Sequence, residues 1–331
     1  MKRVCLWDNL KFFAILCIVL LHSIMPYAMD GMPLIKYVLP FINWYPMTIF
    51  AIISGYWYKE RSFKELLLLF LWPCLLFSVI NNILGCCSHF PNYFTRFLFK
   101  PGYAMWYLMA LFLFSMVTKW VKRWMGIKGY LVLAILIAVT IGLIPIHNRY
   151  FDIQRTSSLF PCFAYGVFLK ECAEQKLLTW KDRGVVRVLC AIIFILCVFI
   201  NISIIHIKPS MHIAMTTYYG LNLKIALAKW MMIILRVIAC TCLIIVFPDK
   251  EYWFTKYGSR TMNVYLLHAI PIFTISWGCL YNYRYEWFGL LSLFVFVPLL
   301  CTLFFSTPVD QFMKKILFSD YIKLIKNKVH R

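Results

Sequence analysis

Long apolar runs separated by short polar segments follow one another along the whole chain. A helix needs roughly 20 mostly apolar residues to cross the hydrocarbon core of a bilayer. Runs of this kind lie near residues 10–29, 37–58, 66–85, 103–121, 130–146, 157–170, 188–207, 228–247, 261–281 and 288–307. The run near 157–170 is shorter than the others and contains Pro161. The pattern predicts an all-α, polytopic transmembrane helical bundle with about ten spanning helices.

Basic residues are distributed unevenly between the two sides of this predicted bundle. If the N-terminus lies inside, the inner segments are 1–6, 59–65, 119–128, 170–187, 250–260 and 314–331. Together they hold 23 Lys and Arg residues. The outer loops hold nine: Lys36, Arg96, Lys100, Arg149, Arg155, Lys208, Lys224, Lys229 and Arg284. Cytoplasmic loops carry an excess of Lys and Arg. The bias predicts that both termini are cytoplasmic, and it supports an even number of spans.

The composition is that of a multi-pass membrane protein. The 331 residues are 63% hydrophobic and 14% charged, whereas a soluble domain is roughly 45–50% apolar and about 25% charged. The net charge of +21 comes from separate loops rather than one basic patch, so nucleic acid is not an expected partner. Without a repeat or a Gly/Ser linker, we expect one membrane domain over 1–313. A basic cytoplasmic tail over 314–331 would anchor at the lipid surface.

The cysteines and the first apolar run each have a second interpretation. The 13 cysteines are scattered singly without a CxxC pair, so we expect small buried hydrophobic residues rather than a disulfide or metal framework. The first run follows Lys2 and Arg3, as a signal peptide would. It lacks a convincing cleavage site and many further runs follow it, so we expect a retained helix.

Ionisable residues inside the predicted spans are the candidates for function, because such groups are expensive in a bilayer. His22, His268 and Arg236 lie within runs, and Lys11 and Arg260 lie at inner helix ends. His22 follows Lys11 by eleven positions, about 1100° of rotation, so both lie on one helix face ~16 Å apart. His268 similarly lies ~12 Å from Arg260. Both histidines therefore reach a comparable depth, although their separation across helices is open.

Several roles remain open for these residues on the sequence alone. Each histidine is also explained as a hydrogen-bonding contact between helices. Two histidines without a third ligand at suitable spacing do not indicate a metal site. Arg236 has three open roles, namely snorkelling to the surface, contacting backbone carbonyls or touching a ligand.

The acidic residues narrow the class of function. All 13 Asp and Glu residues lie at predicted helix ends or in loops, whereas a proton pump or cation transporter usually has a buried carboxylate relay. Cations at the inner edge without buried acidic partners favour an anionic cytoplasmic ligand, such as one bearing phosphate. Lipid headgroups or Asp8 are alternative partners for these cations. A neutral histidine beside such a ligand is suited to proton transfer during group transfer.

Four stretches resemble the acyltransferase-3 family of integral-membrane O-acyltransferases. DNLKFFAILCIVLLH (8–22) matches the spacing of its first-helix signature, a basic residue and then histidine after ten others. Lysine in place of arginine, after Asp-Asn, resembles the fucose 4-O-acetylase-like branch. AMWYLMALF (104–112), QRTSSLFPCFAYGVFLK (154–170) and YGSRTMNVYLLH (257–268) resemble later segments in the same order.

The resemblance implies an acetyl-CoA-dependent O-acyltransferase of the bacterial inner membrane, with no bound cofactor. Its substrates would be acyl-CoA and a sugar hydroxyl of a surface glycan or its lipid-linked precursor. His22 would be the general base, with His268 as a second proton-handling or donor-positioning group. The donor-binding residues would be Lys11 and Arg260, with Asp8 beside them. Residues lining the acceptor side would be Trp106, Tyr107 and Arg155, although Trp106 is equally explained as an interface anchor.

Two other functional classes remain open on the sequence. A transporter or flippase for an anionic or glycolipid substrate also explains a polar cavity with a cationic inner edge, but it predicts no thioester cleavage. A non-catalytic family member acting as a scaffold predicts that His22 is dispensable. No Ser or Cys stands out as an activated nucleophile, so direct transfer is expected rather than a covalent acyl-enzyme.

Overall fold

The computed structural model of the protein describes residues 5–29, 42, 45–87, 104–144, 152–207, 223–272 and 286–319. All regular elements in this part of the chain are helical, which confirms the all-α prediction. They are α1 (Cys5–Met29), α3 (Pro46–Tyr56), α4 (Phe63–Leu66), η1 (Leu67–Leu71), α5 (Trp72–Cys87), α6 (Trp106–Leu143), α7 (Ile153–Phe168), η3 (Leu169–Ala173), α8 (Glu174–Asp182), α9 (Gly184–Ile207), α11 (Leu223–Val246), η4 (Thr255–Arg260), α12 (Thr261–Leu267), α13 (Ala269–Pro271), α14 (Glu286–Phe304) and α15 (Thr307–Ile316).

Five helical stretches in the described residues are long and apolar enough to cross a membrane, and there are six if Phe294–Phe304 and Thr307–Ile316, which are bent by 56°, count together as one span. The five are Cys5–Ile24, Phe63–Asn81, Trp106–Leu143, Gly184–Ile204 and Lys224–Val246. The count of ten spans and the cytoplasmic termini remain predictions, since several predicted runs fall partly outside the described residues. Most of the predicted tail, from residue 320 on, also lies outside them.

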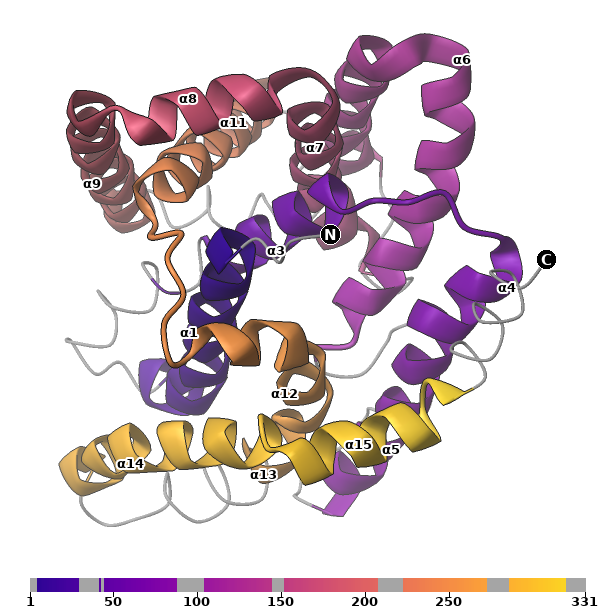
Figure 1. The fold of residues 1–331 in the computed structure, drawn as a ribbon, viewed down its shortest axis with the longest axis vertical. Helices are drawn as coiled ribbons and strands as arrows, with labels where there is room; N and C mark the ends of the chain where they lie inside the picture. Colours follow the sequence, from indigo (N-terminus) through magenta and orange to yellow (C-terminus); the bar gives the residue numbers. More distant parts are fainter. Residues whose placement is uncertain are drawn as a thin grey trace.

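Helix α6 contains two of the predicted runs. At ~1.5 Å per residue its 38 residues would extend ~57 Å as a straight helix, nearly twice the ~30 Å hydrocarbon core. The chain bends at Gly126, whose φ of 67° and ψ of 178° are not helical. The hydroxyls of Thr118 and Tyr130 lie 2.6 Å apart, although twelve residues of straight helix would separate them by ~18 Å. α6 therefore consists of two limbs that fold back toward each other (Figure 1).

A capping box fixes the beginning of the stretch that runs from α4 through η1 into α5. The Ser62 hydroxyl accepts a hydrogen bond from the Glu65 backbone N–H, and the Ser62 backbone N–H donates to the Glu65 carboxylate at 2.7 Å. The two groups satisfy N–H donors that a helix N-terminus leaves unpaired. The helix therefore begins at Phe63, three residues before the predicted apolar run.

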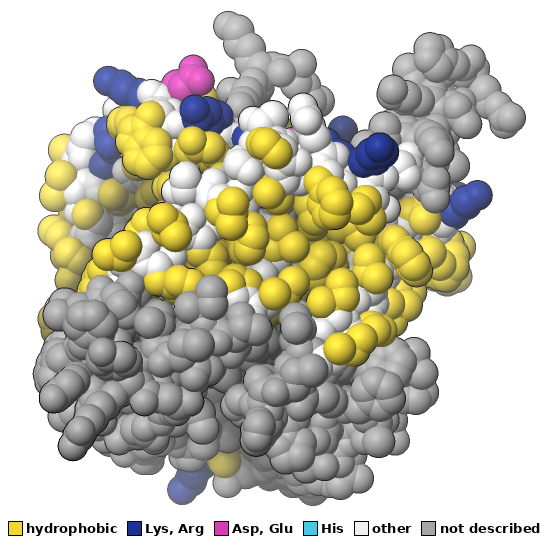
Figure 2. Space-filling model, turned by 90° about the horizontal axis from the view of Figure 1, so that it is seen from below, with side chains coloured by type: hydrophobic (Ala, Val, Ile, Leu, Met, Phe, Trp, Pro, Cys, Tyr) yellow, Lys and Arg dark blue, Asp and Glu magenta, His cyan; other side chains and the backbone are white. Residues whose placement is uncertain are grey.

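Large hydrophobic side chains cover the outside of the bundle (Figure 2). On α14 the side chains of Phe294, Val295 and Leu299 are 68%, 70% and 69% exposed. Figure 2 shows a broad band of such residues, with Lys and Arg side chains along its edge. An apolar surface of this extent is suited to lipid rather than water. The band therefore supports the multi-pass membrane assignment.

The prediction that Lys229 lies in an outer loop is wrong. Lys229 lies inside α11, within the candidate span Lys224–Val246, and its exposed fraction is 0%. The apolar segment that precedes it, residues 225–228, continues the helix on its N-terminal side. Lys229 thus lies inside the span, like Arg236, whereas Lys224 lies at its end.

Glycines bring α3 and α7 into direct backbone contact. A Cβ atom on Gly55 would overlap the carbonyl oxygen of Phe163, and one on Gly166 would overlap that of Ile52. Small residues permit this approach between membrane helices, where van der Waals packing drives association. The pair forms part of the main buried core, together with residues of α1 and α6.

We predict that Gly166→Ala lowers the free energy of unfolding by about 1–3 kcal/mol, because the added methyl group overpacks the α3–α7 contact. Thermal unfolding of the purified protein in detergent measures the loss. Gly184→Ala is the matched control, since nothing lies within 4 Å of a Cβ atom there. Equal midpoints for the two variants would contradict the close packing.

Candidate functional site

The two histidines singled out in the sequence lie together. His22 is on α1, and His268 follows α12 directly. Their ring centroids are 5.4 Å apart, and the ring planes are inclined by 27°. His268 is fully buried, while His22 is half-buried. The matched depth predicted from the sequence therefore corresponds to a stacked pair at the contact of α1 with α12.

The hydrogen bonds of His268 define its tautomer. Nδ1 lies 3.1 Å from the carbonyl oxygen of Val264 and 2.8 Å from that of Tyr265. Carbonyl oxygens only accept hydrogen bonds, so Nδ1 carries a proton. In the neutral ring, Nε2 then presents a lone pair. Nε2 is buried and has no hydrogen-bond partner within the described part of the chain.

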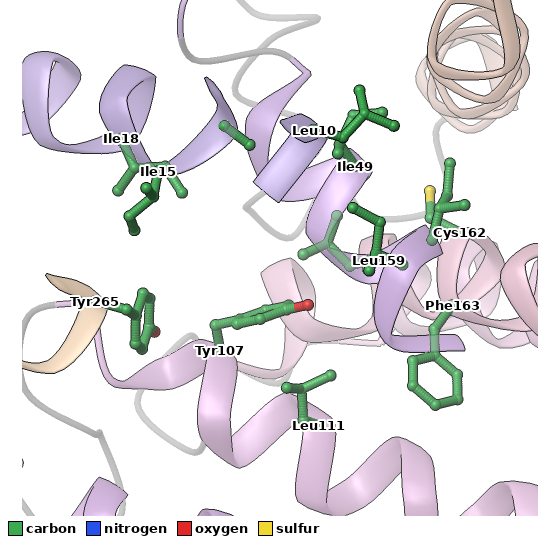
Figure 3. Packing of buried hydrophobic residues seen from close by; sticks show 14 of the residues in the cluster. Leu10, Ile15, Ile18, Ile49, Tyr107, Leu111, Leu159, Cys162, Phe163 and Tyr265 are labelled. Atoms are coloured by element: carbon green, nitrogen blue, oxygen red, sulfur yellow. The ribbon is translucent and has the colours of Figure 1, made fainter. Parts of the chain in front are cut away.

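Two tyrosines, Tyr107 and Tyr265, lie near each other in the buried core (Figure 3), and Tyr265 packs against the ring of His268. The Tyr265 ring lies 6.0 Å from the His268 ring and 6.1 Å from that of Tyr107. The Tyr265 hydroxyl donates to the carbonyl oxygen of Ala104, just before α6. The Tyr107 hydroxyl lies 3.0 Å from that of Ser54 on α3. These contacts hold α12, α6 and α3 together beside the site.

Arg155 and Trp106 add a cation and an aromatic surface to the site. The Arg155 guanidinium carbon lies 4.8 Å from the Trp106 ring centroid, a cation–π geometry. The same guanidinium is within electrostatic range of both His22 and Tyr265. Trp106 is 8% exposed, so it packs inside the protein rather than serving as an interface anchor. The structure thus brings together five of the predicted site residues: His22, His268, Trp106, Tyr107 and Arg155.

Lys11 forms an ion pair with Asp8 one helical turn away. Lys11 Nζ lies 2.8 Å from Asp8 Oδ1, and the Asp8 residue is 7% exposed. The neighbouring Asn9 side chain donates to the carbonyl oxygens of Pro248 and Lys250 at 3.1 and 3.0 Å. These bonds tie the first turn of α1 to the segment before η4.

Arg260 has an acidic partner as well. Its Nη1 donates to the Phe305 carbonyl oxygen at 2.6 Å, and its Nε lies 3.9 Å from Asp310 Oδ2. Asp310 is 8% exposed and also accepts from Asn263 and Lys314. The expectation that the inner-edge cations lack buried acidic partners is therefore wrong. Asp8 and Asp310 lie at helix ends, as predicted, but they are buried there.

A polar cluster joins η3 and the first residue of α8 to Tyr56 on α3. Lys170 lies over the Tyr56 ring at 4.9 Å and pairs with the Glu174 carboxylate at 2.7 Å, which also accepts from the Tyr56 hydroxyl. Burial by itself raises the pKa of Glu174, but the hydrogen bonds from Lys170 and Tyr56 outweigh it and hold this pKa below its ordinary value. Glu174 is therefore ionised at neutral pH.

Tyr265 and Ser54 were not among the site residues predicted from the sequence. Tyr265 could have been predicted from the sequence, because it precedes His268 by three residues and so lies on the same helix face. Ser54 could not have been predicted in this way, because its contact with Tyr107 joins residues that are 53 positions apart in the sequence. Arg236 lies beside the thiols of Cys162 and Cys240. Within the described residues, no three His, Cys, Asp or Glu side chains are placed to hold a metal ion.

Comparison with known proteins identifies one family. The model of an acyltransferase domain, Acyl_transf_3, matches residues 7–307. This range includes all nine residues singled out in the sequence for the candidate site. Comparisons with curated proteins and with solved structures gave no match.

We predict that His268 is the Nδ1-protonated tautomer when neutral, because two carbonyl oxygens face that nitrogen. Nitrogen NMR of protein with ¹⁵N-labelled histidine distinguishes the tautomers. The spectrum of His268→Gln, from which that resonance is missing, provides the assignment. A proton on Nε2 in the neutral ring would be incompatible with the described geometry.

Proposed function

The chain belongs to the acyltransferase-3 family, and on this premise we propose that it transfers an acetyl group from acetyl-CoA to a sugar hydroxyl. The acceptor is a cell-surface glycan or its lipid-linked precursor. The observation that carries the proposal is the stacked pair of His22 and His268 inside the helical bundle. Lysine at position 11, after Asp8 and Asn9, supports the fucose 4-O-acetylase-like branch of the family.

His22 acts as the general base in this proposal. It takes the proton of the acceptor hydroxyl as the oxygen attacks the thioester carbonyl carbon. The C–O bond forms, the C–S bond breaks, and the coenzyme A thiolate leaves and is protonated. The guanidinium of Arg155 lies within electrostatic range of His22 and supplies hydrogen-bond donors beside the reacting groups.

The inner end of α1 binds the donor. Lys11 is half-buried and paired with Asp8, so a donor phosphate competes with that carboxylate for the ammonium group. Lysine binds phosphate as a point charge, whereas arginine offers a planar fork. Arg260 contributes positive charge at the equivalent end of α12, although Phe305 and Asp310 already hold its guanidinium.

The acceptor lies against Trp106, Tyr107 and Arg155. The Trp106 ring, with Arg155 over it, offers a flat surface next to the histidine pair, and the guanidinium supplies hydrogen-bond donors for sugar oxygens. The proposed location is the bacterial inner membrane, with about ten spans and both termini in the cytoplasm. The charge bias across alternate segments supports this topology.

We predict that His22→Ala reduces transfer about 10²–10⁴-fold, the usual contribution of a general base. The measurement follows radiolabelled acetyl-CoA into glycan or glycolipid in membranes from expressing cells, at matched protein levels. Thr140→Ala is the control, because Thr140 is exposed and bonds only to carbonyls of its own helix. Equal labelling by the His22→Ala and Thr140→Ala variants would show that His22 only contributes to packing. No labelling by folded wild type with acceptor present would favour a transporter.

We predict that Lys11→Gln raises the KM for acetyl-CoA about tenfold with a smaller change in kcat, because one charge-assisted hydrogen bond to phosphate is lost. Lys11→Arg should stay close to wild type, since it keeps the charge. Initial rates at varied acetyl-CoA concentration separate the two constants. An unchanged KM in Lys11→Gln would show that the ammonium group serves only Asp8.

A further inference from the structure

Arg236 lies at the centre of a membrane-spanning helix. The candidate span in α11 runs from Lys224 to Val246. Arg236 follows Lys224 by twelve residues and precedes Val246 by ten, which is ~18 Å and ~15 Å along the axis. Long basic side chains reach the membrane surface by snorkelling only near helix ends. At this depth Arg236 does not snorkel.

The side chain faces the inside of the protein. Met232, Ile233, Ala239 and Cys240 are buried, and at 100° per residue all four lie within ~60° of Arg236 around the helix. The residues that face lipid lie on the opposite side of α11: Leu227, Met231, Ile234 and Ile238, which are 57%, 67%, 50% and 42% exposed. Arg236 is therefore at the middle of the interior-facing stripe.

No group in the described part of the chain neutralises Arg236. Its Nε is buried without a hydrogen-bond partner there. The five carboxylates that form ion pairs in this part, those of Asp8, Glu171, Glu174, Asp249 and Asp310, pair with other cations. The guanidinium is within electrostatic range of the thiols of Cys162 on α7 and of Cys240. A guanidinium has five donors and no acceptor, and leaving it unpaired in a membrane is costly.

A second cation lies on the same face of α11. Lys229 precedes Arg236 by seven residues, so it is rotated by only ~20° and lies ~10 Å away along the axis. Lys229 is fully buried. The part of α11 that carries it packs against Ala138 in the second limb of α6. Two interior cations thus lie along the seam between α11 and the helices α6 and α7.

We propose that Arg236 binds a phosphate group of a substrate, with Lys229 adding positive charge along the same seam. A guanidinium is suited to this role because its planar fork binds phosphate in a bidentate manner. Both proposed substrates carry phosphate, namely the acyl-CoA donor and a lipid-linked sugar acceptor. The inference rests on the proposed function only for the choice of these two sources. It assigns Arg236 a ligand outside the histidine pair.

The test is the thermal unfolding midpoint of the purified full chain in nanodiscs, measured with three probes: coenzyme A, farnesyl phosphate and the neutral alcohol farnesol. A phosphate probe at about 100 times its Kd should raise the wild-type midpoint by about 5 °C. Arg236→Met should abolish this rise. Without ligand this variant should be at least as stable as wild type, because it removes an unpaired interior charge. Lys224→Gln, at an exposed lysine of the same helix, should keep the rise.

The two phosphate probes identify the source. A rise with coenzyme A that requires Arg236 assigns the donor phosphate, and one with farnesyl phosphate assigns the lipid-linked phosphate. The proposal is overturned if neither probe raises the midpoint, if farnesol acts equally, or if Arg236→Met responds like wild type. Should Arg236→Met fold poorly, Arg236→Lys replaces it and should show a reduced rise. This readout is independent of acyl transfer, so it stands or fails separately from the proposed function.

Discussion

Inside a bilayer, each polar group needs a partner within the protein, because lipid supplies none. His268 meets this requirement on one side only. Its Nδ1–H is satisfied by carbonyl oxygens of its own helix, while its Nε2 has no hydrogen-bond partner in the described residues, and its ring stacks on that of His22. The helix thereby fixes the tautomer before any substrate arrives. The lone pair of His268 Nε2 is therefore a proton acceptor with a fixed orientation inside an apolar core. The surrounding contacts hold the ring in this orientation.

Those contacts join segments that are distant in the sequence. Tyr265 donates to the carbonyl oxygen of Ala104, and Asn9 bonds to the segment at 248–250. Glycines 55 and 166 let α3 and α7 pack closely behind Tyr107. Each bond satisfies a group that lipid would leave unpaired and at the same time positions a helix of the site. The close packing of the helices and the pairing of their polar groups therefore position the same site residues.

The long apolar runs of the sequence predicted the all-α fold, and helical geometry predicted a comparable depth for the two histidines, because both depend only on local sequence. It did not predict that Asp310 holds Arg260, since the residues are 50 positions apart and their helices meet only in the fold. Lys229 was wrongly assigned to an outer loop because it lies at the very beginning of a predicted apolar run, and basic residues at such positions were counted with the adjoining loop. Its burial depends on which face of α11 meets α6. The two limbs of α6 were visible as two apolar runs separated by Gly126.

In the proposed reaction His22 and His268 act as one unit. The most direct measurement is thiol release from acetyl-CoA by purified wild type, His22→Ala, His268→Gln and the double variant, each with acceptor present. Residues that act together in one step show strongly non-additive losses. We therefore expect the double variant to be no slower than the slower single variant. Losses that multiply would show independent roles, and unchanged rates in the single variants would show that neither histidine takes part in acyl transfer.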